Sequence, residues 1–252
     1  MKYLNISALL VFFILIFSCT SEENKVDENI LYADITLSSQ EQVDNFSSLG
    51  YEQITGYLKI DGLSIIEGES KITSLEGLSN ITSVGRDLNI EDNEALTSLE
   101  GLDNITKVGN ALYITNNIAL TSLKGLDSIA LLGANLYIRQ NEALTSLEGL
   151  EKLTELRGTS LIYSNNSLTS LKGLDSITKV EGMLYIADNS SLISLEGLKA
   201  IDSVGENLTI INNLKLEEFC GIKSIEVIGS LFISGNFDNP TLIEIKSSCS
   251  TD

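Results

Sequence analysis

The chain of 252 residues contains no histidine. This absence excludes nucleophile–histidine catalysis and zinc sites with histidine ligands, because both need an imidazole. Basic residues are also scarce: 16 Lys and Arg stand against 35 Asp and Glu, which gives a formal net charge of −19. Such a charge repels phosphate backbones and no basic patch interrupts it, so we expect no nucleic-acid partner.

Long apolar runs are absent except near the N-terminus, between Leu4 and Phe17. This run is shorter than the roughly 18–20 residues that a spanning helix needs, and its arrangement is typical of a secretory signal. It ends in "IFSC", which resembles a bacterial lipobox. The resemblance implies a signal peptide over 1–18 and a lipid on Cys19, the first residue of the mature chain. An uncleaved anchor, or a signal peptide with an incidental Cys, is the alternative.

Residues 19–33 are predicted to be a tether, because their start, "CTSEENKVDEN", is polar, acidic and without apolar periodicity. Acidic residues after the lipidated Cys, here Glu22 and Glu23, resemble the surface-export signal of Bacteroidetes lipoproteins. The resemblance implies an outer-membrane protein anchored by lipid on the cell surface, with the periplasmic face as the alternative. The remaining cysteines of such an exported chain, Cys220 and Cys249, are predicted to form one disulfide.

A 24-residue repeat fills most of the remaining chain. "LTSLEGLDNITKVGNALYITNN" begins at Leu96, and "LTSLKGLDSIALLGANLYIRQN" begins at Leu120. A fixed period of this length indicates a solenoid, in which each unit buries its apolar face against its neighbours. Two columns keep the spacing: Gly77, Gly101, Gly125, Gly149, Gly173, Gly197 and Gly221, and Asn93, Asn117, Asn141, Asn165, Asn189 and Asn213, continued by Asn236 after one deletion.

Each repeat is predicted to form one β coil with about three flat sides. The "LxI" words alternate as strands do, and the runs between Gly and Asn corners are too short for ordinary helices. Glycine suits a strained corner, while Asn tolerates the left-handed region and its amide can bond the Asn of the next coil. We therefore expect about seven coils over 57–236.

Both ends of the predicted solenoid are expected to be capped, which blocks end-to-end pairing of the sheets. Over 34–56 we expect a cap with a short helix, in which Ser38 and Glu41 form a capping box. Val43, Phe46 and Leu49 would share one face of this helix, and a glycine, Gly50, would end it. Over 237–252 we expect a second cap, where Pro240 stops strand pairing and the disulfide closes the end.

The words Leu-Gly-Leu, Val-Gly and Leu-x-Ile-x-x-Asn resemble the receptor L-domain repeat, the module of the ligand-binding lobes of the insulin and epidermal growth factor receptors. The opening "DITLSSQEQVDNFSSLGYEQITGYLKI" resembles the first strand, helix and coil of that module. The resemblance covers about 34–249 and implies an all-β, right-handed β-helix related to leucine-rich repeats. A leucine-rich-repeat horseshoe is the alternative, because its repeats fit the same words and length.

Two outward columns of the predicted strands gather aromatic residues. Tyrosine combines a large rigid surface with a polar tip, which is why it is common where partners dock. Aromatic columns also stabilise sheets by stacking, so a binding face and a structural ladder are both open interpretations. The candidate ligand-binding face consists of Tyr113, Tyr137, Arg139, Tyr163, Tyr185 and Phe232.

Two further columns have a structural and a functional interpretation. Acidic residues follow the "GL" word in four successive repeats: Asp103, Asp127, Glu151 and Asp175. They are expected to form either a solvated charge ladder or a Ca²⁺ site. The words "DSI" and "DSV" resemble the short O-glycosylation motif of Bacteroidetes exported proteins, with ordinary polar corners as the alternative. This resemblance implies sugar on Ser128, Ser176 or Ser203.

The sequence favours a binding protein over an enzyme. A β-helix enzyme acting on polysaccharides needs unlike groups converging in a cleft, whereas the acids here recur with the period. We expect a lipid-anchored, monomeric rod, without a required cofactor, that presents its tyrosines to a protein or glycan partner in adhesion or recognition. A polysaccharide-acting β-helix enzyme and a passive structural surface protein are the alternatives.

Overall fold

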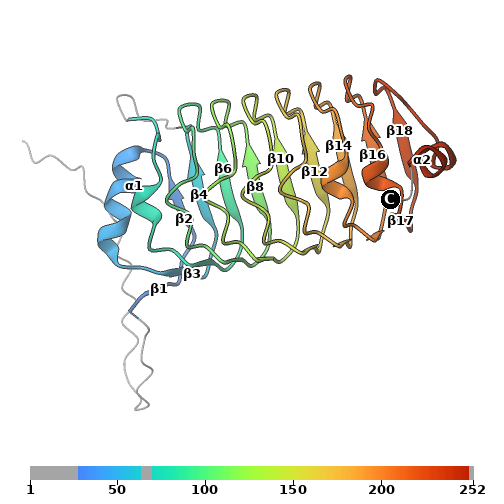
Figure 1. The fold of residues 1–252 in the computed structure, drawn as a ribbon. Coiled ribbons are helices and arrows are strands. Elements are labelled where there is room, and N and C mark those ends of the chain that lie inside the picture. Colours follow the sequence, from blue (N-terminus) through green and yellow to red (C-terminus); the bar gives the residue numbers. More distant parts are fainter. Residues whose placement is uncertain (1–27, 64–69, 250–252) are drawn as a thin grey trace, which may run out of the picture.

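The computed structural model describes residues 28–63 and 70–249. Within them the chain forms a β-solenoid whose coils follow one another in a row, with one α-helix near each end (Figure 1). Strands of successive coils pair in parallel, at a spacing of one repeat. The fold class expected from the repeat, a mainly β right-handed β-helix, is confirmed, and the horseshoe alternative is wrong.

One side of the solenoid is a nine-stranded parallel sheet that takes one strand from each coil. Nine successive strands correspond to eight turns, one more than expected, because the first strand comes from the predicted N-terminal cap. The strands are β2 (Ile35–Leu37), β4 (Leu58–Asp61), β6 (Leu88–Glu91), β8 (Leu112–Thr115), β10 (Leu136–Arg139), β12 (Ser160–Tyr163), β14 (Leu184–Ala187), β16 (Leu208–Ile211) and β18 (Leu231–Ser234).

A second side consists of two-residue strands in two shorter parallel sheets. The first sheet contains β1 (Ile30–Leu31), β3 (Gln53–Ile54), β5 (Ser83–Val84), β7 (Lys107–Val108) and β9 (Leu131–Leu132). The second contains β11 (Glu155–Leu156), β13 (Lys179–Val180), β15 (Ser203–Val204) and β17 (Glu226–Val227). Strand β1 lies inside the predicted tether 19–33, so the folded body begins before the expected boundary.

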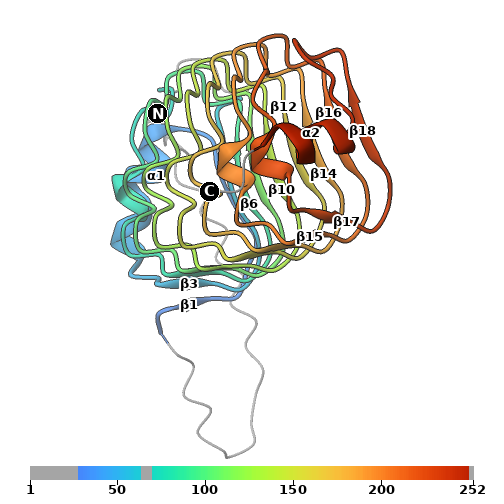
Figure 2. The ribbon, with the colours of Figure 1, turned by 45° about the vertical axis from the view of Figure 1, so that its right-hand side comes forward.

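The stacked coils enclose the interior of the rod (Figure 2). This interior is filled by one continuous core, mainly of Leu, Ile and Val side chains. In the four-residue strands from β4 to β16 the first and third residues are buried and the second points outward, as strand alternation requires. In β18, the last strand of the sheet, the first and third residues are only half-buried. Ser160 replaces the Leu that neighbouring coils place at its position, Leu136 and Leu184. Its side chain is fully buried and the hydroxyl has no hydrogen-bond partner.

The asparagine column forms a buried ladder along one corner. The Asn117 backbone N–H and its side-chain Nδ2 both donate to Asn141 Oδ1, at 3.1 and 3.3 Å. Nδ2 also donates to the carbonyl of Ile90 in the preceding coil, at 2.9 Å. The predicted ladder is therefore present, and it satisfies backbone groups that the corner removes from the sheets.

The left-handed backbone at this corner falls on the residue before each ladder Asn, not on the Asn as expected. Six such residues have φ between 55° and 60°: Asp92, Asn116, Gln140, Ser164, Asp188 and Asn212. Two of these positions hold Gln and Ser, which seldom adopt this conformation. The ladder bonds of the following Asn hold the strained residue in place.

The second corner needs glycine in every coil because a side chain would clash with the preceding coil. The backbone conformation of this glycine, however, is of two kinds. A Cβ on Gly125 would lie 2.1 Å from the carbonyl oxygen of Leu99 in the preceding coil. Gly125 also has a φ of 106°, whereas Gly77, Gly197 and Gly221 lie in 3₁₀ turns. Those turns are η2 (Glu76–Leu78), η3 (Glu196–Leu198) and η4 (Cys220–Ile222).

At the N-terminal end, helix α1 (Gln40–Phe46) buries Val43 and Phe46 against the solenoid. Its N-cap is Ser39, whose hydroxyl accepts from the Gln42 N–H, so the predicted Ser38–Glu41 capping box is wrong. The 3₁₀ turn η1 (Ser47–Leu49) follows and ends at Gly50, as expected, with a φ of 73°. Leu49 does not share the buried face, because it is 43% exposed.

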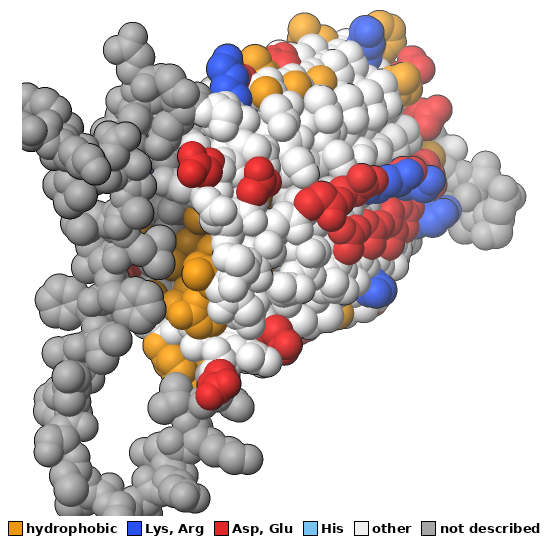
Figure 3. All heavy atoms as spheres, turned by 90° about the vertical axis from the view of Figure 1, so that its left-hand side faces the viewer, with side chains coloured by type: hydrophobic (Ala, Val, Ile, Leu, Met, Phe, Trp, Pro, Cys, Tyr) orange, Lys and Arg blue, Asp and Glu red, His pale blue; other side chains and the backbone are white. Residues whose placement is uncertain are grey.

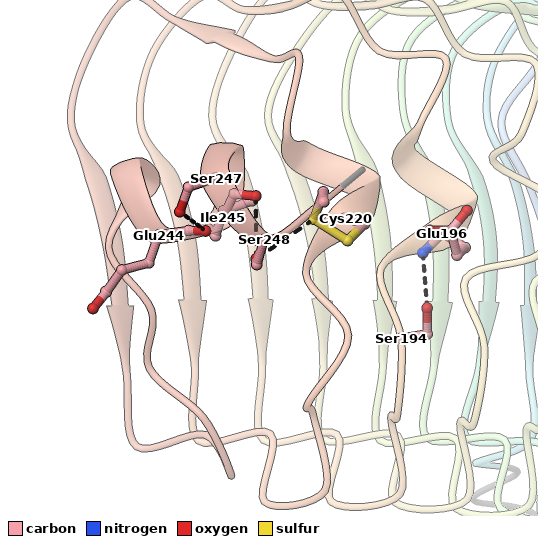
Figure 4. Close-up of a disulfide and its surroundings, with 8 residues drawn as sticks. Ser194, Glu196, Cys220, Glu244, Ile245, Ser247 and Ser248 are labelled. Atoms are coloured by element: carbon pink, nitrogen blue, oxygen red, sulfur yellow. Dashed lines mark hydrogen bonds between the residues drawn. A yellow bond between two sulfur atoms is a disulfide. The ribbon is translucent and has the colours of Figure 1, made fainter. Parts of the chain in front are cut away.

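At the C-terminal end, helix α2 (Leu242–Ser248) packs beside η4 and is joined to it by the Cys220–Cys249 disulfide (Figure 4). The expected disulfide is therefore present, with 5.5 Å between the two Cα atoms. The helix was not expected, yet Thr241 and Glu244 form a complete capping box at its start. This pair three residues apart is the sequence signal that identifies the helix.

Candidate functional site

The candidate face is the outward surface of the nine-stranded sheet. Strand register places the second residues of the strands in one column and the fourth residues in another. The first column reads Lys59, Asn89, Tyr113, Tyr137, Leu161, Tyr185, Thr209 and Phe232. The second reads Asp61, Glu91, Thr115, Arg139, Tyr163, Ala187, Ile211 and Ser234. We call the outward side chains of β8, β10, β12 and β14 the tyrosine face.

The tyrosines of this face are paired, and they are half-buried rather than fully exposed as expected. The rings of Tyr113 and Tyr137 stack with centroids 4.7 Å apart and planes 14° apart. At this distance each ring covers one face of the other. Tyr163 and Tyr185 meet edge to face at 6.2 Å, which leaves ring surface open. The first pair therefore stacks along the rod as the ladder interpretation expects, which leaves the binding interpretation open.

Phe232 lies apart from the other predicted residues. It belongs to β18, and Thr209 of β16 separates it from Tyr185 along the column. It is 52% exposed, and other apolar side chains at the C-terminal end of the rod, Ile228, Phe237 and Ile243, are exposed as well. The structure thus groups the four tyrosines with Arg139 and leaves Phe232 at the end of the sheet.

Arg139 occupies the middle of the tyrosine face. Its Nη1 donates to the hydroxyl of Tyr163 at 2.9 Å, and its Nε donates to Thr115 Oγ1 at 3.3 Å. Among the described residues no carboxylate lies within ion-pair distance of it. Its pKa is raised, mainly by the bond to Tyr163, so the guanidinium stays charged. The sequence placed Arg139 in this column but gave no sign of its bonds to both neighbouring coils.

A cluster of charges lies at the N-terminal end of the same sheet. Lys59 Nζ lies 2.8 Å from an oxygen of Asp61 and 3.3 Å from an oxygen of Glu91. The bond to Asp61 is the main reason why the pKa of Lys59 is raised. A lysine with a raised pKa is a poor general base, since catalysis at neutral pH needs a lowered one. The sequence analysis did not identify this cluster, which only the parallel register of β4 and β6 brings together.

Burial is also the main reason why the pKa values of Tyr113 and Tyr185 are raised. Their phenols therefore remain protonated over the physiological range and can donate hydrogen bonds. From β8 to β18 the outward positions of the sheet carry a single charge, that of Arg139. These outward positions thus carry one positive charge in a chain with a net charge of −19, with the carboxylates of Asp92 and Asp188 at the strand ends beside them.

The acidic column has a structural role. The carboxylates of Asp103, Asp127, Glu151 and Asp175 each accept a hydrogen bond from the N–H of the glycine two residues earlier, at 2.8–3.0 Å. These are the four coils whose glycine has a positive φ. Where Ser79, Lys199 or Lys223 replaces the acid, the corner is a 3₁₀ turn. The residue after "GL" therefore correlates with the type of corner.

Charges of the neighbouring column alternate and form ion pairs between coils. Glu148 lies 2.6 Å from Lys172 and 3.9 Å from Lys124, and the bond to Lys172 is the main reason why its pKa is lowered. In the view of Figure 3, acidic and basic side chains adjoin one another on the flank of the rod. In the described ranges no group of three His, Cys, Asp or Glu side chains is placed to hold a metal ion.

The remaining predicted sites are dispersed. Ser128 and Ser176 occupy equivalent corners, where Ser176 is exposed and Ser128 half-buried, whereas Ser203 lies within β15. Cys19, with Glu22 and Glu23, lies outside the described residues. An opening of about 650 Å³ lies beside the contact of α2 with the last coils, and carboxylates line much of it, among them Glu196, Glu218 and Glu244.

Among the described residues, no helix is both long and apolar enough to cross a membrane. Comparisons of the chain with protein-family models, with curated proteins and with solved structures find no match.

Proposed function

We propose that this protein is a binding protein of the bacterial cell envelope, held by lipid on Cys19 at the outer membrane and facing the cell exterior. In this proposal the tyrosine face meets a protein or glycan partner. The observation that carries it is the concentration of four tyrosines and one arginine on four adjacent strands of an acidic chain, where the arginine forms no ion pair with any described residue.

The rigidity of the face supports a role in binding. Its strands lie in the interior of a nine-stranded sheet, and the ring pairs and Arg139 bonds already order the side chains. Little conformational freedom is then lost when a partner binds, so more of the contact energy remains as affinity. Tyrosine and arginine are also the residues that most often dominate binding energy at interfaces.

We further propose that the protein is not an enzyme. The one cluster of unlike charges on this sheet, around Lys59, has its charges paired with one another and a lysine with a raised pKa. The tyrosine face carries no carboxylate in its outward positions. Glycoside hydrolysis needs a pair of carboxylates, which this face does not provide.

The binding proposal is tested by replacing Tyr113, Tyr137 and Tyr185 with Ser. These side chains point away from the core, so the solenoid should fold, as circular dichroism can verify. Loss of one or two anchors of about 1.4 kcal/mol or more should weaken binding to cells or to a glycan array by roughly tenfold. Tyr32→Ser is the matched control, because Tyr32 is 68% exposed outside this face. Equal binding by the triple variant and the wild type would refute the binding proposal and leave the tyrosines only a structural role in the sheet.

The anchor is tested separately with Cys19→Ala. Wild-type protein produced in a suitable bacterial host should take up labelled fatty acid and partition into detergent, and the variant should do neither. Identical behaviour of the two proteins would refute lipidation and, with it, the proposed location.

A further inference from the structure

The tyrosine face offers more free hydrogen-bond donors than acceptors. Arginine has five N–H donors, of which Arg139 uses two, so three remain without a partner among the described residues. The hydroxyl of Tyr163 accepts from Arg139, so its own proton is available to another acceptor. Burial keeps Tyr113 and Tyr185 protonated. The face therefore offers mainly donors around one fixed positive charge.

The guanidinium is held in position before any ligand arrives. Its two bonds lead to opposite neighbours, because Thr115 belongs to the preceding coil and Tyr163 to the following one. A planar guanidinium with free donors suits a carboxylate, which it can bind through two parallel hydrogen bonds. The carboxylates that act on Arg139, Glu91 and Asp92, belong to the coil two strands away, about 10 Å by the strand spacing. Glu91 already pairs with Lys59, and Asp92 accepts from the Asn116 amide.

We infer that the ligand of the tyrosine face is an acidic polysaccharide, with the carboxylate of a uronic acid unit bound by Arg139 and neighbouring units lying along the tyrosines. This inference rests on the proposed function and specifies the partner. The four strands span about 14 Å along the rod, enough for several consecutive sugar units. The open ring surface of the Tyr163–Tyr185 pair can contact the apolar face of a sugar ring, and the phenol hydroxyls can bond its hydroxyl groups.

The net charge of the chain does not prevent such binding. Charges separated by more than about 8 Å are largely screened at physiological ionic strength. The acidic column lies at a different corner, where its carboxylates bond the glycine N–H groups of their own turns. The outward strand positions of the tyrosine face carry only the charge of Arg139, and carboxylates lie at its margins: Glu91 and Asp92 toward the N-terminal end, and Asp188 directly after β14.

A glycan fits this surface better than an acidic peptide does. An extended peptide usually binds a sheet by adding a strand to a free edge, and the four strands of the tyrosine face are all paired on both sides. A peptide on this surface would have to bind through side chains only. Poly-glutamate is therefore the appropriate competitor in the test.

The test uses the full-length protein and three probes: oligogalacturonate, its fully methyl-esterified form, and poly-glutamate. The first two have the same sugar backbone and differ only in charge. We expect the wild type to bind oligogalacturonate at least tenfold more tightly than the ester in calorimetry at physiological salt. Because a uronic acid other than galacturonate is compatible with the geometry, alginate and hyaluronan oligosaccharides are measured in parallel. Failure of every acidic glycan to bind would overturn the inference, as would equal binding of acid and ester or tighter binding of poly-glutamate.

Two variants separate Arg139 from the overall charge. Arg139→Gln should weaken oligogalacturonate binding by roughly tenfold or more, whereas Arg157→Gln, which removes the same charge next to Glu155 on another side, should not. Arg139→Lys keeps the charge and should retain a preference for the acid, and it guards against a folding defect in the Gln variant. If the triple tyrosine variant loses a neutral ligand while Arg139→Gln has no effect, the proposed function stands and this inference fails.

Discussion

The asparagine ladder should be the hydrogen-bond network whose loss lowers the stability of the solenoid most. Asn141→Ala tests this at a position inside the ladder. The Asn141 side chain accepts from the Asn117 N–H at 3.1 Å and donates to the carbonyls of Ile114 and Arg139 at 2.9 and 3.1 Å. Without it, the Asn117 N–H lies buried with no acceptor, which costs about 1–3 kcal/mol. The lost donor bonds add about 1 kcal/mol, so we expect stability to fall by about 2–4 kcal/mol.

Two controls define the expected pattern. Asn166→Ala removes an exposed amide that donates to Glu142 and accepts from the Ser190 hydroxyl. Because these bonds lie at the surface, it should change stability by no more than about 0.5 kcal/mol. Asn93 begins the ladder, and its Oδ1 has no partner among the described residues, so Asn93→Ala leaves no N–H without an acceptor. We expect it to cost about 1 kcal/mol, between the other two.

The assay is urea unfolding followed by circular dichroism with the disulfide intact. Stability differences should appear as a shift in the midpoint, with the slope against urea unchanged. Equal unfolding midpoints for Asn141→Ala and Asn166→Ala would show that the ladder does not stabilise the fold, which would refute the prediction.

Three further predictions concern single sites. Replacing Cys220 and Cys249 with Ser should lower stability by about 3–4 kcal/mol, because the disulfide closes a segment with a sequence separation of 29. Two free thiols in mass spectrometry of the unreduced wild type would contradict the pairing. Ser160→Ala should raise the unfolding midpoint by an amount equivalent to about 1 kcal/mol, because it removes a buried hydroxyl without a partner, and a lower midpoint would indicate an unseen bond. The phenol of Tyr113 should ionise above the usual value near 10, so its contribution to stability is complete below that pH and is lost as the pH rises through the raised pKa. The tyrosinate absorbance of the wild type minus that of Tyr113→Phe measures this, and titration at or below the value of free tyrosine would refute it.

Periodicity made the architecture predictable, because the Gly and Asn columns can keep their 24-residue spacing only if successive coils stack. What the repeat leaves undetermined is local. Four of the six left-handed corner residues are Asn or Asp, which favour this conformation, but at Gln140 and Ser164 the residue type gives no signal. There the ladder bonds of the Asn that follows hold the strained residue in place. Helix α2 did have a signal in Thr241 and Glu244, but we interpreted the segment only as a break in the repeat.

The candidate site was predicted in part, for a physical reason. Strand alternation determines that Tyr113 and Arg139 point outward, and parallel register determines that they lie in adjacent coils. Alternation does not determine how outward side chains meet one another. The ring stacking of Tyr113 on Tyr137 and the bonds of Arg139 to Thr115 and Tyr163 depend on side-chain rotamers, which the pattern of residue types does not specify.

The ladder has a further consequence for how the chain reaches this structure. Most of the bonds between its asparagines join residues 24 apart, which is about one-tenth of the length of the chain. Because the coils are nearly identical, their side chains do not distinguish pairing with the adjacent repeat from pairing with the repeat after it. Pairing with the more distant repeat would require a loop twice as long and therefore a greater loss of chain entropy. The connection length thus selects the register, and each completed coil becomes a template on which the following coil can fold.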